Sequence, residues 1–166
     1  ERNESVTPQE ISDRVYWDMC IPNNTIMIRA NVMRKFGYED MLIGEDYYLF
    51  YHMNKQGYKM GTVAKELVKT RVRDDSITAK KRAEGYESKL YIKKDIIVPL
   101  FLNDNVYIWG AGSCGEQVQK TLKKHSFYIK GFIDSDYNKQ GMNIDGIIID
   151  NPAILLQIKS PKIIVA

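Results

Sequence analysis

A glycine-rich hexapeptide in the second half of the chain constrains the fold more than any other feature. The loop Gly110-Ala111-Gly112-Ser113-Cys114-Gly115 follows the β-prone run Val106–Trp109 and precedes a helical segment that ends near Lys124. In such a strand–loop–helix context the first glycine permits a tight turn, the second allows close approach to the backbone, and the third allows the helix to contact the strand. The spacing therefore predicts the first strand–helix unit of a Rossmann-like domain.

The rest of the second half alternates between strand and helix patterns. Further strands are predicted at residues 128–134, 147–149 and 162–166, with a short helix at residues 152–158. Short strands that alternate with helices are typical of a parallel sheet with crossover helices. We therefore expect an α/β fold in which this half forms a small four-stranded parallel sheet. With the strands numbered along the chain, the expected order is 3-2-1-4.

The glycine loop is also a candidate binding site. N–H groups at the start of a helix can hold a phosphate, which makes Gly110, Gly112, Ser113 and Gly115 candidate contacts to a nucleotide. Asp134 ends the next predicted strand, where an acidic side chain can bind a ribose hydroxyl. A purely structural turn explains the same glycines equally well. Asp134-Ser135-Asp136 has D-x-D spacing, but a turn or a ribose contact is favoured over a metal site.

The first half has a different pattern, of helices with short strands. Helices are predicted at residues 8–19, 30–36 and 45–56, strands at residues 24–29, 58–64 and 67–71, and a Lys- and Glu-rich connecting helix at residues 79–100. Thr7 suits the N-cap of the first helix, and Gly57 follows the third as a C-terminal glycine. We accordingly divide the chain into domains at residues 1–95 and 96–166.

An acidic pair, Glu45 and Asp46, opens the third of these helices after Gly44. A carboxylate within reach of a hydroxyl can act as a general base, and a helix N-terminus favours its ionised form. Acidic residues are also common in the first turn simply because they stabilise the helix start. Local chemistry alone favours this second role.

A resemblance shifts the balance towards catalysis. The segments that carry it are Ile21-Pro22-Asn23-Asn24-Thr25-Ile26-Met27-Ile28-Arg29, Phe36-Gly37-Tyr38, Gly44-Glu45-Asp46-Tyr47-Tyr48-Leu49, Gly57-Tyr58-Lys59-Met60 and residues 70–78. Together they resemble the C-terminal half of family-2 inverting glycosyltransferases of the GT-A fold. The resemblance implies that Asp46 is the general base. It also implies that the nucleotide-binding half, with a D-x-D motif for Mg²⁺ or Mn²⁺, lies upstream, so that this fragment alone is inactive and the metal belongs only to the full-length enzyme.

Two arginines follow the acidic pair in this half. In some relatives an Arg-x-His motif closes the domain, and here Arg71 and Arg73 occupy it, with arginine in place of histidine. Arginine does not serve as a metal ligand in this way, but it can hold a diphosphate through charge-assisted hydrogen bonds. The alternative is a surface loop in which the arginines pair with Asp74 and Asp75.

The second half carries a resemblance of its own, over about residues 105–166. The run from Gly110 to Gly146 resembles the small Rossmann-like domain at the N-terminus of bacterial sugar O-acyltransferases. That resemblance implies binding of a nucleotide-linked sugar. It does not imply hydride transfer, because the sequence shows no candidate residue that would assist such a reaction.

Composition narrows the function classes. The formal net charge is +3 and the charges are evenly spread, which does not favour a nucleic-acid partner. The two cysteines, Cys20 and Cys114, lack the spacing of a zinc site or a disulfide framework, and no apolar run reaches transmembrane length. We expect a cytoplasmic protein. Lysines 80, 81, 89, 93 and 94 allow weak association with the inner face of a membrane, although a solvated helix face is the favoured explanation.

Three functions remain open at this point. The first is a bacterial-type glycosyltransferase of surface polysaccharide biosynthesis, which moves a sugar from a nucleotide-sugar donor to a saccharide or lipid-linked acceptor. The second is a non-catalytic module that binds a nucleotide sugar or a dinucleotide at the glycine loop. NAD-dependent oxidoreduction ranks last.

Overall fold

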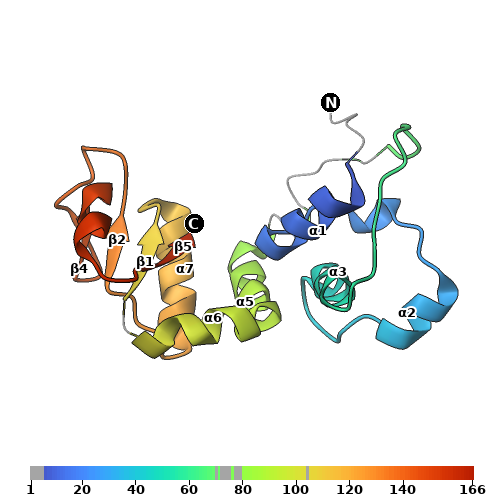
Figure 1. Cartoon of the computed structure of the whole chain (residues 1–166), viewed down its shortest axis with the longest axis horizontal. Coiled ribbons are helices and arrows are strands. Elements are labelled where there is room, and N and C mark those ends of the chain that lie inside the picture. The colour runs from blue at the N-terminus through green and yellow to red at the C-terminus, as the bar shows by residue number, and fades with distance from the viewer. Residues whose placement is uncertain (1–5, 70, 72–75, 77–79, 104) are drawn as a thin grey trace. The chain divides into compact units, whose positions relative to one another are not determined.

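The computed structural model describes residues 6–69, 71, 76, 80–103 and 105–166 (Figure 1). The chain divides into two compact units, Glu1–Ser88 and Lys89–Ala166, a few residues before the boundary predicted from the sequence. Helices together with a mostly parallel sheet confirm the α/β fold class.

The first unit is built from helices. They are α1 (Pro8–Trp17), the 3₁₀ turn η1 (Asn23–Thr25), α2 (Ala30–Phe36), α3 (Glu45–Lys55) and the beginning of α5 (Arg82–Ile92). The start of α1 is fixed by a capping box. The Thr7 hydroxyl accepts a hydrogen bond from the Glu10 N–H, while the Thr7 N–H donates to the Glu10 carboxylate at 2.7 Å. The cap predicted at Thr7 is therefore confirmed.

Packing in the first unit centres on α3. Leu49, Phe50 and Met53 form a core against partly buried apolar side chains from residues 19–36, 58 and 60. On the other side, α1 lies against α3 and is tied to it by two hydrogen bonds. The Tyr47 hydroxyl donates to the Val15 carbonyl at 2.8 Å, and the Asn54 amide donates to the Ser12 carbonyl at 2.9 Å. These bonds satisfy polar groups that would otherwise be costly to bury.

The strands predicted in the first half are wrong for the residues that the structure describes there. Residues 24–29 begin in the η1 turn and continue as unpaired chain, and the described parts of residues 58–64 and 67–71 form no ladder. Ile26 and Arg29 have extended dihedral angles. Alternating side chains favour an extended backbone, but a strand also needs a neighbour to hydrogen-bond with, and none of the described segments supplies one.

The second unit holds a five-stranded sheet. The strands are β1 (Val106–Trp109), β2 (Gly131–Ile133), β3 (Asn143–Ile144), β4 (Ile147–Asp150) and β5 (Lys162–Val165), in the order β3-β4-β2-β1-β5. β4, β2, β1 and β5 pair in parallel. These are the four strands expected from the sequence, in the expected order.

The fifth strand was not anticipated. β3 pairs antiparallel with β4 across the turn Asp145-Gly146, where both residues have positive φ, 51° and 83°. Two such residues define a tight hairpin turn, for which Asp-Gly is a strong signal. A strand of two residues is too short to show a periodic pattern, so only the turn residues indicate this hairpin.

Helices complete the second unit. α7 (Ser113–Lys124) contacts β1, η3 (Pro152–Gln157) precedes β5, and the predicted connecting helix is divided at Lys93 into α5 and α6 (Lys94–Leu100), which η2 (Phe101–Asn103) follows. The core of the unit comprises Leu90, Ile108, Ala111, Leu122, Phe132 and Ile149. Strand, helix and glycine-loop residues thus share one apolar interior.

Phe132→Ala tests how much this core contributes to stability. Phe132 is fully buried in β2, so its truncation should lower the free energy of unfolding of the second unit by about 3–5 kcal/mol. The chain has two tryptophans, Trp17 in the first unit and Trp109 in β1. In a Trp17→Phe background, Trp109 fluorescence during urea denaturation therefore reports on the second unit. Tyr128→Ala, at a side chain 69% exposed, is the control, and an equal loss in both variants would contradict the core assignment.

Candidate functional site

The glycine loop lies between β1 and α7, at the carboxyl edge of the sheet. Gly110 has φ +110°, and its N–H donates to the Ile133 carbonyl of the adjacent strand at 2.8 Å. A Cβ at this position would lie 2.9 Å from the Ala166 carbonyl oxygen. Gly110 is therefore required both by its backbone conformation and by space.

Gly115 is required for a different reason. It lies in the first turn of α7, and a Cβ there would overlap the carbonyl oxygen of Gly110 and touch Ile108. The absence of a side chain lets the helix approach its own loop and β1. This is the helix–strand contact that the spacing predicts for the third glycine.

Gly112 is the exception among the three. Its φ of −105° and ψ of −169° are open to any residue, and a Cβ would meet nothing within 4 Å. Gly112 is the N-cap of α7 and has no side-chain cap hydrogen bond, while the side chains of Ser113 and Cys114 are exposed. The backbone N–H groups of this first turn are thus available to an anion.

Asp134 follows β2 directly and is 9% exposed. One carboxylate oxygen, Oδ2, accepts from the Ala111 N–H at 2.9 Å and from the Lys139 ammonium at 2.9 Å. The other, Oδ1, accepts from the Asp136 N–H at 2.9 Å. These bonds from Asp136, Lys139 and Ala111 lower the pKa of Asp134 to about 2. The carboxylate is therefore ionised and accepts from three protein donors, and the ribose contact expected from the sequence stays a prediction.

Lys139 is the member of this cluster that sequence reasoning missed. Hydrogen bonding to Asp134 raises the pKa of its ammonium group. No motif in the sequence relates Lys139 to Asp134, which lies five residues earlier, directly after β2. The turn geometry that does so begins with the Asp136 N–H bond to Asp134, an Asx turn, and that turn was the available signal.

Asp46 and Glu45 lie in the first turn of α3. Gly44 precedes them with φ 92° as the N-cap, and the helix has no side-chain cap. Asp46 is partly buried, and its Oδ1 accepts from the Tyr47 N–H at 2.7 Å. Burial raises the pKa of Asp46, and the neighbouring Glu45 carboxylate adds to the rise. Desolvation thus outweighs the stabilisation of the anion that the helix start was expected to supply.

Of the two arginines predicted to bind phosphate, the structure describes Arg71. Arg71 is exposed, and no hydrogen bond or ion pair links it to Glu45 or Asp46 among the described residues. Arg73 lies outside the described residues. The described residues likewise hold no group of three or more His, Cys, Asp or Glu side chains that could bind a metal ion.

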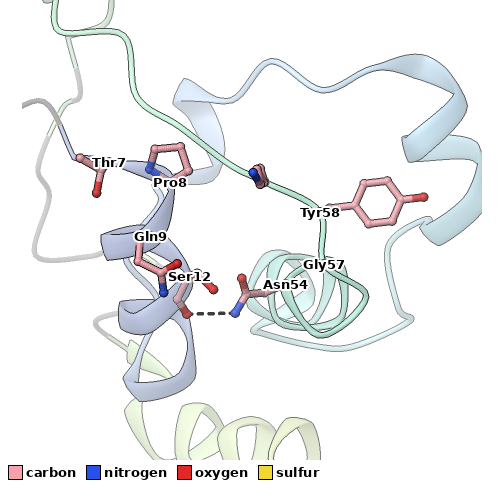
Figure 2. A pocket seen from close by; sticks show the side chains of 8 residues that line it. Thr7, Pro8, Gln9, Ser12, Asn54, Gly57 and Tyr58 are labelled. Carbon is pink, nitrogen blue, oxygen red and sulfur yellow. Dashed lines mark hydrogen bonds between the residues drawn. The ribbon is translucent and has the colours of Figure 1, made fainter.

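A pocket of about 390 Å³ lies in the first unit, and none of the predicted site residues lines it (Figure 2). Its lining comes from the start of α1, the end of α3 and the segment after it, and comprises Thr7, Pro8, Gln9, Ser12, Asn54, Gly57, Tyr58 and Lys59. A hydrogen bond from the Asn54 amide to the Ser12 carbonyl joins two of the lining residues. The acidic pair lies at the opposite end of α3.

Comparison with known proteins gives one match. Residues 102–166 match a family model described as "C2185-like, N-terminal", a stretch shorter than half of the chain that coincides with the sheet-bearing part of the second unit. No curated protein and no solved structure matches the chain. Both resemblances drawn from the sequence therefore stay predictions. Within the described residues no helix is long and apolar enough to cross a membrane.

The glycines of the loop allow a matched test of structure. Gly115→Ala should destabilise the second unit by about 1–3 kcal/mol, because its Cβ has no space beside the Gly110 carbonyl. Gly112→Ala should change stability by no more than about 0.5 kcal/mol, since that Cβ enters open space. Urea denaturation followed by Trp109 fluorescence measures both. Similar effects of the two substitutions would show that the loop is not built as described.

Proposed function

We propose that this chain forms part of an inverting glycosyltransferase in which Asp46 is the general base. The observation that carries the proposal is the position of Asp46, a partly buried carboxylate in the first turn of α3 whose pKa is raised by burial. A general base is most effective when its pKa approaches the working pH. A carboxylate that served only as a helix cap would gain nothing from desolvation.

The reaction assigns a single task to this carboxylate. The acceptor hydroxyl of a saccharide or lipid-linked sugar attacks the anomeric carbon of the donor, and Asp46 takes its proton. The new C–O bond forms as the bond to the nucleoside diphosphate breaks, and the configuration inverts. Negative charge develops on the departing diphosphate, where Mg²⁺ or Mn²⁺ or a cationic side chain would offset it. Arg71 and Arg73 are the candidates on this chain for that contact.

The unpaired extended segments of the first unit are consistent with this proposal. Ile26 and Arg29 have strand-like dihedral angles without a ladder, and Met27 between them is fully exposed. A catalytic domain whose sheet is completed by a nucleotide-binding half would give such segments partners.

Asp46→Asn, made in the protein at its natural length, tests the assignment. Turnover should fall by about 10²–10⁴-fold, because asparagine cannot accept the proton, while donor affinity should stay near the wild-type value. Initial rates with a uridine diphosphate sugar and calorimetric titration of uridine diphosphate measure the two quantities. Asp40→Asn removes the same charge at an exposed neighbouring position and should leave both unchanged. Near-normal turnover in Asp46→Asn would refute the role.

A second function is favoured for the second unit by the geometry of Gly112. We propose that the glycine loop binds the phosphate of a nucleotide or nucleotide sugar. The fold requires Gly110 and Gly115 but leaves open space at Gly112. A glycine that packing does not require is explained by a ligand that approaches the backbone, and the uncapped first turn of α7 supplies N–H donors beside it.

Gly112→Val separates this function from a structural turn. Valine is compatible with the local backbone and space, so the unit should stay folded while uridine diphosphate binding is lost. Calorimetry measures binding, and Trp109 fluorescence monitors the fold. Gly85→Val makes the same change in α5, also in open space, and should bind as the wild type does. If the wild type binds neither uridine diphosphate nor NAD, the loop is a structural turn.

A further inference from the structure

The carboxylate of Asp134 is the best-satisfied polar group at the glycine loop. We propose that Asp134 is a positioning residue, which fixes the glycine loop through the Ala111 N–H and is withheld from the ribose of any ligand. The statement about ribose rests on the phosphate site proposed above, whereas the statement about the loop stands on the contacts alone. It replaces the ribose-binding role expected from the sequence.

Counting acceptor sites supports this role. A carboxylate offers about four lone-pair positions. Oδ2 uses two, for the Ala111 N–H and the Lys139 ammonium, and Oδ1 uses one, for the Asp136 N–H. Three of the four positions are thus occupied, and the fourth is on Oδ1 of a group that is 9% exposed. A ribose hydroxyl would meet a largely buried acid, and its exchange for any of the three donors would break a charge-assisted hydrogen bond, which is among the stronger kinds.

The same contacts join three segments into one body. Ala111 belongs to the loop after β1, Asp134 to the end of β2, and Lys139 to the following turn, and both donors meet on the same oxygen atom. Two backbone bonds reinforce the join, from the Gly110 N–H to the Ile133 carbonyl and from the Asp134 N–H to the Asp150 carbonyl. The direction in which the remaining loop N–H groups point is therefore set by Asp134.

The bond between Asp134 and the Ala111 N–H limits which donors of the loop a ligand can use. The Ala111 N–H is already bonded, so a ligand can use only the N–H groups from Gly112 onward. Recognition at this edge then depends on phosphate and not on the ribose contact that distinguishes dinucleotide sites. Pyrophosphate and NAD should accordingly respond alike to a change at Asp134.

Acid should release the loop. Among the described residues, the charged group in contact with the Asp134 carboxylate is the Lys139 ammonium. Asp136 contributes its backbone N–H to the carboxylate, and the Asp150 carbonyl accepts from the Asp134 N–H. Because the pKa of Asp134 is lowered from 3.8 to about 2 on folding, its stabilisation is complete above about pH 4. It is lost as the pH falls towards 2.

Amide hydrogen exchange of the whole chain tests the positioning role directly. In Asp134→Ala the Ala111 N–H should exchange at least about tenfold faster than in the wild type, since a bond to a charged acceptor is lost. Asp136→Asn removes a charge two residues away, without a side-chain contact to the loop, and should leave Ala111 protected. Lys139→Met keeps the carboxylate and should also keep most of the protection. If Asp134→Ala does not fold, the carboxyl titration of wild-type Asp134 by NMR decides the question instead.

Each outcome of these experiments either supports or overturns the positioning role of Asp134. Loss of Ala111 protection in Asp134→Ala alone, or a wild-type Asp134 that titrates near pH 2, supports the role. Unchanged exchange at Ala111, or a titration near the ordinary value of 3.8, overturns it. In calorimetry, an Asp134→Asn protein that loses affinity for NAD but not for pyrophosphate would identify a ribose acceptor and also overturn it. If neither probe binds the wild type, the proposed phosphate site fails, and hydrogen exchange still decides the role of Asp134.

Discussion

The second unit depends on the close approach of α7 to the strand that precedes it. Gly115 makes the approach possible because any side chain there would collide with the Gly110 carbonyl. Gly110 in turn bends the chain in a conformation that other residues rarely adopt, with its N–H bonded to β2. The start of the helix, the carboxyl ends of two strands and the acid after β2 are thereby held together. Every candidate ligand contact in this unit depends on that geometry.

Sequence reasoning succeeded where local chemistry decides the outcome. Thr7 identifies the N-cap of α1, Gly57 follows the C-cap of α3 with positive φ, and three spaced glycines identify the loop, because each is a short-range requirement on the backbone. The parallel sheet and its strand order followed from the alternation of strand and helix, since few connections are possible. The structure contains all of these features.

It failed where a distant partner decides. Residues 24–29 are β-prone and residues 58–64 alternate like a strand, yet no neighbouring strand pairs with either among the described residues. The sequence predicts a ribose contact for Asp134, which stays a prediction, but it does not predict the bonds of Asp134 to Lys139 and to the Ala111 N–H. Asp46 was placed correctly at the start of α3, while the rise of its pKa depends on burial by the rest of the unit. None of these partners can be read from the residues nearby.

The two edges of the sheet are not equivalent. At one edge the two-residue strand β3 turns back on β4 through Asp145-Gly146 and ends the sheet with a very short antiparallel strand. At the other edge β5 pairs only with β1 among the described residues, and Val165 there is 71% exposed. A strand edge with unpaired N–H and C=O groups is a template for another strand. A further strand, from this polypeptide or from another, would therefore add to the sheet beside β5. That edge is next to β1, the strand that leads into the glycine loop.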